Sequence, residues 1–306
     1  MLSRSIVRAT LIALCLFCVD RQAFAEPTSL TINEVYPGLA SGALSYAKDA
    51  NLPQGVLLRA GVLQITANEL QQDVDNARSD MREQLKKNAF FHLEQLVTKK
   101  LLLIAAKQDS NSAAAKNDDE LITDYIAKVT NKVEVNDAEV TKFYEANKEM
   151  CGGATLGQVK DQLREYVLQQ KQQDTVDKYI KTLGQRMPIE VSSSWVREQA
   201  KSAKDNPVDK ARSSGLASLI DFGSTGCRPC DMMTPVLANL KQKYSGKLNV
   251  LFVHVKEEPV LASRYGIQTI PVQIFFGKDG KEISRHSGFY PQIEIEKQLQ
   301  AMGVMQ

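Results

Sequence analysis

The chain has 306 residues, of which 43% are hydrophobic and 24% are charged, so it is long enough for two domains and can bury a core in each. Residues 1–25 carry three Arg and one Asp, and the remainder carries 35 basic and 35 acidic side chains. This balance gives no electrostatic basis for binding nucleic acid or an anionic membrane. No later apolar run has the roughly 20 residues that span a bilayer, so we expect no stable membrane insertion.

Residues 1–25 have the pattern of a cleaved secretory signal peptide. Arg4 and Arg8 precede an apolar run at residues 9–19, and an A-x-A cleavage signal ends at Ala25. A transmembrane anchor is the alternative, but a run of 11 residues is too short for one. We therefore expect an exported protein in a periplasmic or otherwise extracytoplasmic, oxidising space.

The chain from residue 26 to residue 104 predicts one short strand followed by helices. Its first part is rich in Gly, Pro and small side chains and predicts little structure, whereas residues 56–60 predict a strand. Thr66 and Glu69 can form a capping box, so a helix should begin there. Apolar residues then recur at helical spacing as far as Ile104.

The next segment predicts a loop, a series of helices and a strand. Residues 110–119 are polar and predict the loop, and a helical stripe follows. Asn136 and Glu139 form a second capping-box pattern. Residues 155–186 predict one long helix, which must end at Pro188 because proline breaks helices. A short strand is expected immediately after this proline.

The pattern changes after residues 192–209, which are charged and polar and predict a connection between two domains. Compact apolar runs of strand length then alternate with helical stretches, which favours an α/β domain at residues 207–306. The predicted strands are at residues 216–222, 248–255, 272–276 and, with a weaker pattern, 282–286.

Cys227 and Cys230 are the candidate redox pair. They have C-x-x-C spacing between a predicted strand and a predicted helix, and a helix N-terminus stabilises the thiolate that attacks disulfides. An inert structural disulfide is the alternative. Cys151 is expected to be a small buried or loop thiol, with a regulatory or intermolecular role as the alternative. The scattered His and Cys residues do not supply the four ligands of a closed zinc site, so we expect no metal.

Segments on both sides of the cysteine pair carry features of a known protein family. Residues 219–222 form a strand leading into the motif, Pro235 lies in the following helix, and residues 265–271 end in a proline. With these segments, residues 216–302 resemble a thioredoxin domain along nearly their whole length. The resemblance implies a central mixed sheet flanked by helices. It also implies a thiol–disulfide oxidoreductase that acts on protein disulfides and needs no cofactor.

The same resemblance implies a role for each residue of the redox centre. Cys227 would be the nucleophile and Cys230 the resolving cysteine. Asp221 occupies the place of the buried acid that assists proton transfer at the resolving cysteine. An ordinary strand-end carboxylate is the alternative for Asp221, since such residues are common.

The resemblance further implies a substrate-binding surface. Pro271 takes the place of the cis-proline that shapes the substrate groove, although a plain turn proline is the alternative. Ile270 precedes it and favours a reductant. Arg228 and Pro229 replace the usual Gly-Pro between the cysteines and are expected to contact substrate.

Four departures from the family pattern, the replacement of Gly-Pro by Arg228 and Pro229 among them, bear on the redox potential and on docking to a standard thioredoxin reductase. Gly226 stands where the family has Trp, and Asp231 where it often has Lys. The basic residue near the buried acid is replaced by Phe252. We expect Arg228 to favour the Cys227 thiolate and Asp231 to oppose it.

Residues 56–191, within the predicted N-terminal domain at residues 26–206, carry a second, weaker resemblance. The matching segments are residues 65–70, 93–107, 139–148, 159–183 and 189–191. They resemble the N-terminal chaperone domain of SurA-type periplasmic foldases. The parvulin prolyl isomerase domain that often interrupts this family is missing, because only Cys151-Gly152-Gly153 occupies that gap. The resemblance implies a helical client-binding or docking domain, and a helical spacer or dimerisation arm is the alternative.

The two resemblances together predict an exported, reductant-leaning oxidoreductase with a client-binding domain. Its expected partners are the thiols and disulfides of unfolded or misfolded exported proteins, and a membrane or periplasmic electron donor. The alternative is an extracytoplasmic chaperone in which the thioredoxin fold is mainly a binding platform.

Overall fold

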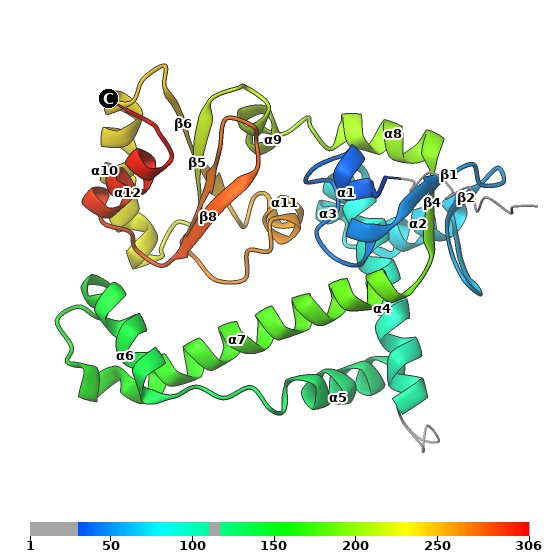
Figure 1. Cartoon of the computed structure of the whole chain (residues 1–306), viewed down its shortest axis with the longest axis horizontal. Helices are drawn as coiled ribbons and strands as arrows, with labels where there is room; N and C mark the ends of the chain where they lie inside the picture. Colours follow the sequence, from blue (N-terminus) through cyan, green and yellow to red (C-terminus); the bar gives the residue numbers. More distant parts are fainter. Residues whose placement is uncertain (1–29, 110–116, 306) are drawn as a thin grey trace, which may run out of the picture.

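The computed structural model describes residues 30–109 and 117–305. The predicted signal peptide and most of the predicted loop at 110–119 lie outside these residues. Two regions, each with its own sheet and core, lie side by side (Figure 1). Within the described ranges, none of the helices combines the length and apolar character needed to cross a membrane.

The N-terminal region contains a small mixed sheet with the strand order β1-β4-β2-β3. The strands are β1 (Lys48–Ala50), β2 (Val56–Ala60), β3 (Leu63–Thr66) and β4 (Ile189–Ser192). The strands predicted around residues 56–60 and after Pro188 are confirmed as β2 and β4, which pair antiparallel. The expectation of little structure before residue 56 is wrong, because α1 (Ile32–Val35) and a short 3-10 helix, η1 (Ala43–Tyr46), precede β1 there. Alanine, leucine and isoleucine side chains of that segment are buried in the core, which no local periodicity reveals.

Most of the N-terminal region is helical. Its helices are α2 (Ala67–Asn76), α3 (Ser79–Lys87), α4 (Ala89–Asp109), α5 (Asp118–Thr130), α6 (Asp137–Ala146), the 3-10 turn η2 (Lys148–Cys151) and α7 (Leu156–Arg186). Thr66 caps α2 by accepting a hydrogen bond from the backbone N–H of Glu69. Asn136 and Glu139 form the expected capping box at α6. Both helix starts are therefore confirmed.

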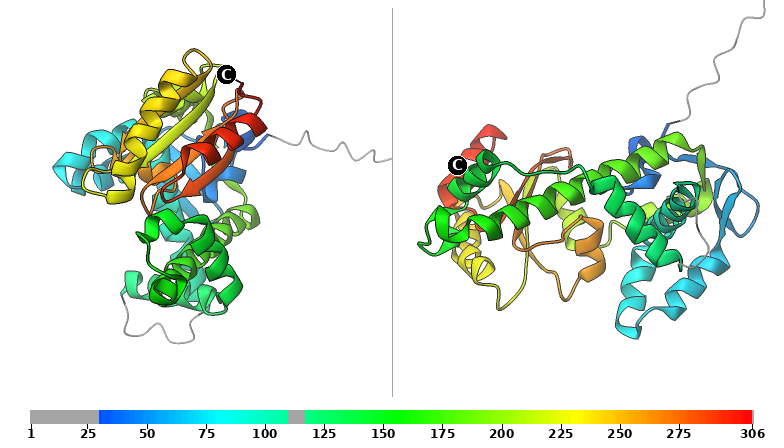
Figure 2. Two further views of the ribbon diagram at one scale, coloured as in Figure 1. Left: turned by 90° about the vertical axis from the view of Figure 1, so that its left-hand side faces the viewer. Right: turned by 90° about the horizontal axis from the view of Figure 1, so that it is seen from below.

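The long helix α7 joins the two ends of the molecule. At its C-terminal end, a methyl group on Gly184 would lie only 2.0 Å from the carbonyl oxygen of Ala43, so glycine is required for this close packing. At its other end, α6, η2 and the first half of α7 lie beside the C-terminal domain (Figures 1 and 2). We call these residues, 137–170, the arm.

The segment predicted as the connection contains two helices, α8 (Ser193–Ser202) and α9 (Pro207–Arg212). Val196 of α8 is buried in the N-terminal core, and the ring of Trp195 stacks on Phe90 with centroids 6.1 Å apart. Val208 of α9 is buried in the C-terminal core. The chain therefore passes from one core to the other between these two helices.

The C-terminal domain has a four-stranded sheet with the order β6-β5-β7-β8, in which only β5 and β6 are parallel. Apolar cores lie on both of its faces, so the expected mixed sheet flanked by helices is confirmed. The elements are β5 (Ala217–Gly223), α10 (Arg228–Lys243), β6 (Leu248–His254), α11 (Pro259–Arg264), β7 (Val272–Phe276), β8 (Glu282–Ser287) and α12 (Gln292–Ala301).

A buried ion pair fixes the junction of the two regions. Arg264 of α11 donates to Asp209 of α9 at 2.7 Å, and both side chains are buried. The same guanidinium donates to the carbonyl oxygens of Ala203, at 3.0 Å, and Gly38, at 3.2 Å, which both belong to the N-terminal region. These bonds satisfy the buried charge and tie the two regions together.

Candidate active site

Cys227 and Cys230 form a disulfide, with their Cα atoms 5.2 Å apart. Cys227 is the N-cap residue of α10, and Arg228 and Pro229 begin the helix. The predicted position of Cys227 at a helix N-terminus is therefore confirmed. Cys227 is half-buried, whereas Cys230 is only 3% exposed. The reachable sulfur is thus the one that the helix dipole and the free backbone N–H groups can stabilise as a thiolate.

Asp221 is fully buried in β5, next to β7. Its register partner Gln273 donates a hydrogen bond from Nε2 to Oδ1 at 2.7 Å, and Oδ2 has no partner among the described residues. Burial raises the pKa of Asp221 from 3.8 to about 6, against the opposing effect of the Gln273 bond. The carboxyl group can therefore accept or release a proton near neutral pH.

The side of β5 that carries Asp221 faces Cys230. Gly223 lies two residues further along the strand and hence on the same face. A methyl group on Gly223 would be 3.4 Å from both Cβ and Sγ of Cys230, so the start of α10 lies directly over this face. Phe252, the register partner of Asp221 on β6, reaches to 2.8 Å from the same methyl position. An apolar ring thus stands where the family resemblance places a basic residue.

The proline loop lies at the same end of the sheet as the cysteine motif. The Ile270–Pro271 peptide bond is cis. Pro271 directly precedes Val272, which pairs with Phe222 at the end of β5 from which the chain runs to Cys227. The carbonyl oxygen of Pro271 accepts a hydrogen bond from the backbone N–H of Gly288 at 2.8 Å.

The arm of the N-terminal region contacts both of these loops. The hydroxyl of Tyr166 in α7 donates to Oγ1 of Thr269, two residues before Pro271, at 3.3 Å. A methyl group on Gly152, in the turn between η2 and α7, would lie 3.9 Å from a guanidinium nitrogen of Arg228. The redox site is therefore flanked by residues from outside the thioredoxin-like segment.

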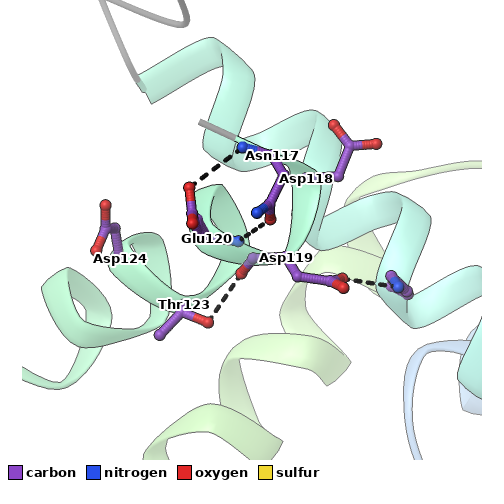
Figure 3. Close-up of a pocket in the computed structure, with 7 residues that line it drawn as sticks. Asn117, Asp118, Asp119, Glu120, Thr123 and Asp124 are labelled. Carbon is purple, nitrogen blue, oxygen red and sulfur yellow. Dashed lines mark hydrogen bonds and ion pairs between the residues drawn. The ribbon is translucent and has the colours of Figure 1, made fainter. Parts of the chain in front are cut away.

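Away from the redox site, a hollow of about 700 Å³ lies at the start of α5 (Figure 3). Asn117 and Glu120 form a capping box there, and Asp119 pairs with Lys99 at 2.7 Å. These interactions are those of a solvated helix start. Across the described residues, no group of three or more His, Cys, Asp and Glu side chains could hold a metal ion.

Some residues of the site could not be found from the sequence. Gln273 is a buried amide whose only signal is its register position beside Asp221. Tyr166 and Gly152 lie in the helical region and become part of the surroundings of the site only when the arm packs on the C-terminal domain. No local pattern marks either of them.

Comparisons with known proteins match this part of the chain. The sequence profile of the Thioredoxin family matches residues 199–301. Thioredoxins of Staphylococcus epidermidis and Staphylococcus aureus are each 38% identical to this chain over 95 residues, which is 31% of this chain and 89% of each relative. The SurA-like identity of the N-terminal region stays a prediction.

Solved structures of thioredoxins also match the same share of the chain. The crystal structure of chloroplastic thioredoxin z is 25% identical and covers 31% of this chain and 85% of that one, with a TM-score of 0.29. A mutant thioredoxin from Halobacterium salinarum NRC-1 is 25% identical and covers 32% and 84%, with a TM-score of 0.30. On the sequence relatives and the cysteine pair, the chain belongs to the thioredoxin family and is a thiol–disulfide oxidoreductase.

Proposed function

We propose that this protein is an exported oxidoreductase that reduces disulfides in unfolded or misfolded exported proteins. One observation carries the proposal. A half-buried Cys227 at the start of α10 is bonded to a buried Cys230. Cys230 lies over the face of β5 that carries Asp221, whose Oδ2 has no hydrogen-bond partner among the described residues. This arrangement contains a nucleophile, a resolving thiol and a proton acceptor, in the order in which disulfide reduction needs them.

The reaction starts from the dithiol form of the protein. The Cys227 thiolate attacks one sulfur of the substrate disulfide, the substrate S–S bond breaks, and the other substrate sulfur leaves as a thiolate. Cys230 then gives its proton to Asp221 and attacks the Cys227 sulfur, which releases the second substrate sulfur as a thiolate. The substrate gains two electrons, its two thiolates take up the proton held by Asp221 and one from water to give a dithiol, and the protein is left with the Cys227–Cys230 disulfide.

The next cycle requires a dithiol donor that takes up this disulfide and becomes oxidised itself. In an extracytoplasmic space such a donor would be a membrane or periplasmic protein. Ile270, before Pro271, is the residue on which the reductant direction rests. These steps use no metal and no organic cofactor. A reduction potential of about −270 mV would support a reductant, whereas one of about −120 mV would identify an oxidant.

We assign two further features to export and to client binding. The charge and apolar pattern of residues 1–25 supports export. The helical N-terminal region supports client binding, since its arm reaches Thr269 and Arg228 beside the redox pair. A client held there would experience a high effective concentration of Cys227, without any change in thiol chemistry.

Cysteine substitutions test the proposed chemistry. Cys230→Ser should accumulate mixed disulfides with protein substrates, because the bond at Cys227 can no longer be resolved. Cys227→Ser should form none and should lose turnover. Non-reducing mass spectrometry of each variant after incubation with a disulfide-bonded protein measures this difference. Normal turnover in both variants would exclude the proposed chemistry.

The chaperone alternative has its own test. A binding platform needs no thiol, so the double variant Cys227→Ser, Cys230→Ser would suppress aggregation of an unfolded, disulfide-bonded protein as well as the parent does. Light scattering during refolding measures this. We expect the parent, supplied with a dithiol, to restore soluble protein faster than the double variant, because only the parent can break wrong disulfides.

A further inference from the structure

His254 lies at the end of β6, and its imidazole contacts the turn that precedes the nucleophile. The strand register places His254 beside Gly223, the last residue of β5. Its Nε2 accepts a hydrogen bond from the backbone N–H of Thr225 at 3.2 Å, and Oγ1 of Thr225 lies 3.3 Å from the same nitrogen. Thr225 is two residues before Cys227 in the chain. The imidazole therefore holds the main chain close to the redox pair.

The bond to Thr225 determines the form of the imidazole. A backbone N–H can only donate, so Nε2 must offer its lone pair, and in the neutral ring the proton is on Nδ1. Nδ1 has no hydrogen-bond partner among the described residues, because Glu257 Oε1 is 3.9 Å away, too far for such a bond. The ring of Phe252 stands edge-on to the imidazole, with centroids 6.3 Å apart. With only 15% of the His254 side chain exposed, the ring has little room for another rotamer.

The turn that His254 holds has few other contacts to fix it. Gly226, between Thr225 and Cys227, has a φ of +75°, a left-handed conformation that favours glycine. Thr225 and Gly226 are both exposed, and no backbone–backbone hydrogen bond joins residues 224–226 to the rest of the described chain. The bond to His254 therefore ties this turn to the edge of the sheet.

This tie matters most in the dithiol form of the protein. In the disulfide form, Cys227 is held by its covalent bond to the buried Cys230. After reduction that bond is gone, and the position of the Cys227 sulfur depends on the turn before it and on α10 after it. The helix stabilises the thiolate only while the sulfur stays beside its free backbone N–H groups.

We propose that His254 is a positioning residue for the nucleophile. By accepting the N–H of Thr225, its Nε2 fixes the turn before Cys227, and the sulfur of the dithiol form stays at the start of α10. Without the acceptor, the turn around Gly226 becomes free to move, and the thiolate loses part of its stabilisation by the helix. The inference rests on the proposed role of Cys227 as the attacking thiolate.

Alkylation of the full-length protein, reduced with dithiothreitol, measures this stabilisation. The rate at which iodoacetamide modifies Cys227 follows its thiolate fraction, and mass spectrometry separates Cys227 from the other cysteines. His254→Leu removes the acceptor and should move the midpoint of the pH–rate profile upward by about half a pH unit. His254→Gln supplies a side-chain oxygen to the same N–H and should restore most of the original midpoint.

Two further variants isolate the bond. His92→Leu removes another shielded imidazole, which is 12% exposed and lies 3.0 Å from Asp73 in the N-terminal region, and should leave the midpoint unchanged. Thr225→Val removes the hydroxyl and keeps the backbone N–H, so it should leave the midpoint unchanged as well. An unmoved midpoint in His254→Leu would overturn the proposal. A shift of equal size in any of the other three variants would also overturn it.

Nitrogen-15 chemical shifts of the imidazoles in the unaltered dithiol protein give a reading that does not depend on a variant folding. His254 should show a protonated Nδ1 and an unprotonated Nε2, and a neutral ring with its proton on Nε2 would overturn the proposal. Alkylation needs no protein substrate, so its result is separate from the proposed function. A parent that reduces no disulfide would overturn that function, whereas the alkylation midpoints decide the role of His254.

Discussion

The two regions of the protein each bury a carboxylate, and they surround it differently. In the N-terminal region, Glu94 is 1% exposed and accepts hydrogen bonds from three backbone N–H groups before and within η1 and from the hydroxyl of Ser41. In the C-terminal domain, Asp221 is fully buried and accepts one hydrogen bond, from Gln273, while Oδ2 has no partner among the described residues. Both side chains are inaccessible, but only one has unused bonding capacity.

This difference separates a structural carboxylate from one that can take part in chemistry. Burial raises the pKa of both groups, and four hydrogen bonds oppose the effect at Glu94 but only one at Asp221. Glu94 organises the chain around η1, and its oxygens are fully occupied. Asp221 keeps a free oxygen on the strand face that meets Cys230, where proton transfer is needed.

The largest effect on stability is expected at the structural carboxylate. Glu94→Leu leaves three backbone N–H groups without their acceptor and should lower the free energy of unfolding by about 4 kcal/mol. Glu94→Gln keeps one carbonyl oxygen and should lose about half as much. Urea unfolding of the three proteins measures this. A Leu variant as stable as the parent would show that the hydrogen bonds of Glu94 do not stabilise the fold.

Asp221→Asn should produce a pH-dependent effect. Because the pKa of Asp221 is raised from 3.8 to about 6, the folded state binds more protons than the unfolded state between these values. The stability that this carboxyl provides is therefore complete below its unfolded pKa and is lost as the pH rises through 6. Relative to the variant, the parent should lose about 3 kcal/mol between acidic and neutral pH.

Unfolding free energies of the parent and the Asn variant at a series of pH values measure this difference, in which all other titrating groups cancel. The rate of mixed-disulfide resolution should also rise through pH 6 in the parent only, since the carboxylate form of Asp221 accepts the proton of Cys230. Parallel stability curves together with identical pH–rate profiles would make Asp221 an ordinary buried acid.

The smallest effect is expected where the two regions meet at α3 and α11. Gln84 donates to the carbonyl oxygen of Glu257 at 2.8 Å and accepts from the backbone N–H of Val260 at 3.3 Å. Gln84→Ala should cost about 1 kcal/mol and speed hydrogen exchange at the start of α11. Gln71→Ala, which removes an amide bonded to Asp75 within α2, is the matched control. Equal exchange in both variants would show that Gln84 does not couple the regions.

Local patterns were sufficient for much of the fold and for the centre of the site. The capping residues Thr66 and Asn136 begin helices as expected, and α7 ends before Pro188. The spacing of Cys227 and Cys230 and the apolar strand before them located the redox pair. These features depend on hydrogen bonds and periodicities within a few residues, which a sequence displays directly.

Only the tertiary structure decided which distant residues meet. Gln273 lies beside Asp221 because β7 pairs with β5 in one particular register, and Tyr166 meets Thr269 because α7 carries the arm across to the C-terminal domain. Strand β4 likewise pairs with β2, although the helices from α2 to α7 separate the two strands in the sequence. Such contacts depend on how apolar faces pack between remote segments, and no local propensity encodes this choice of partner.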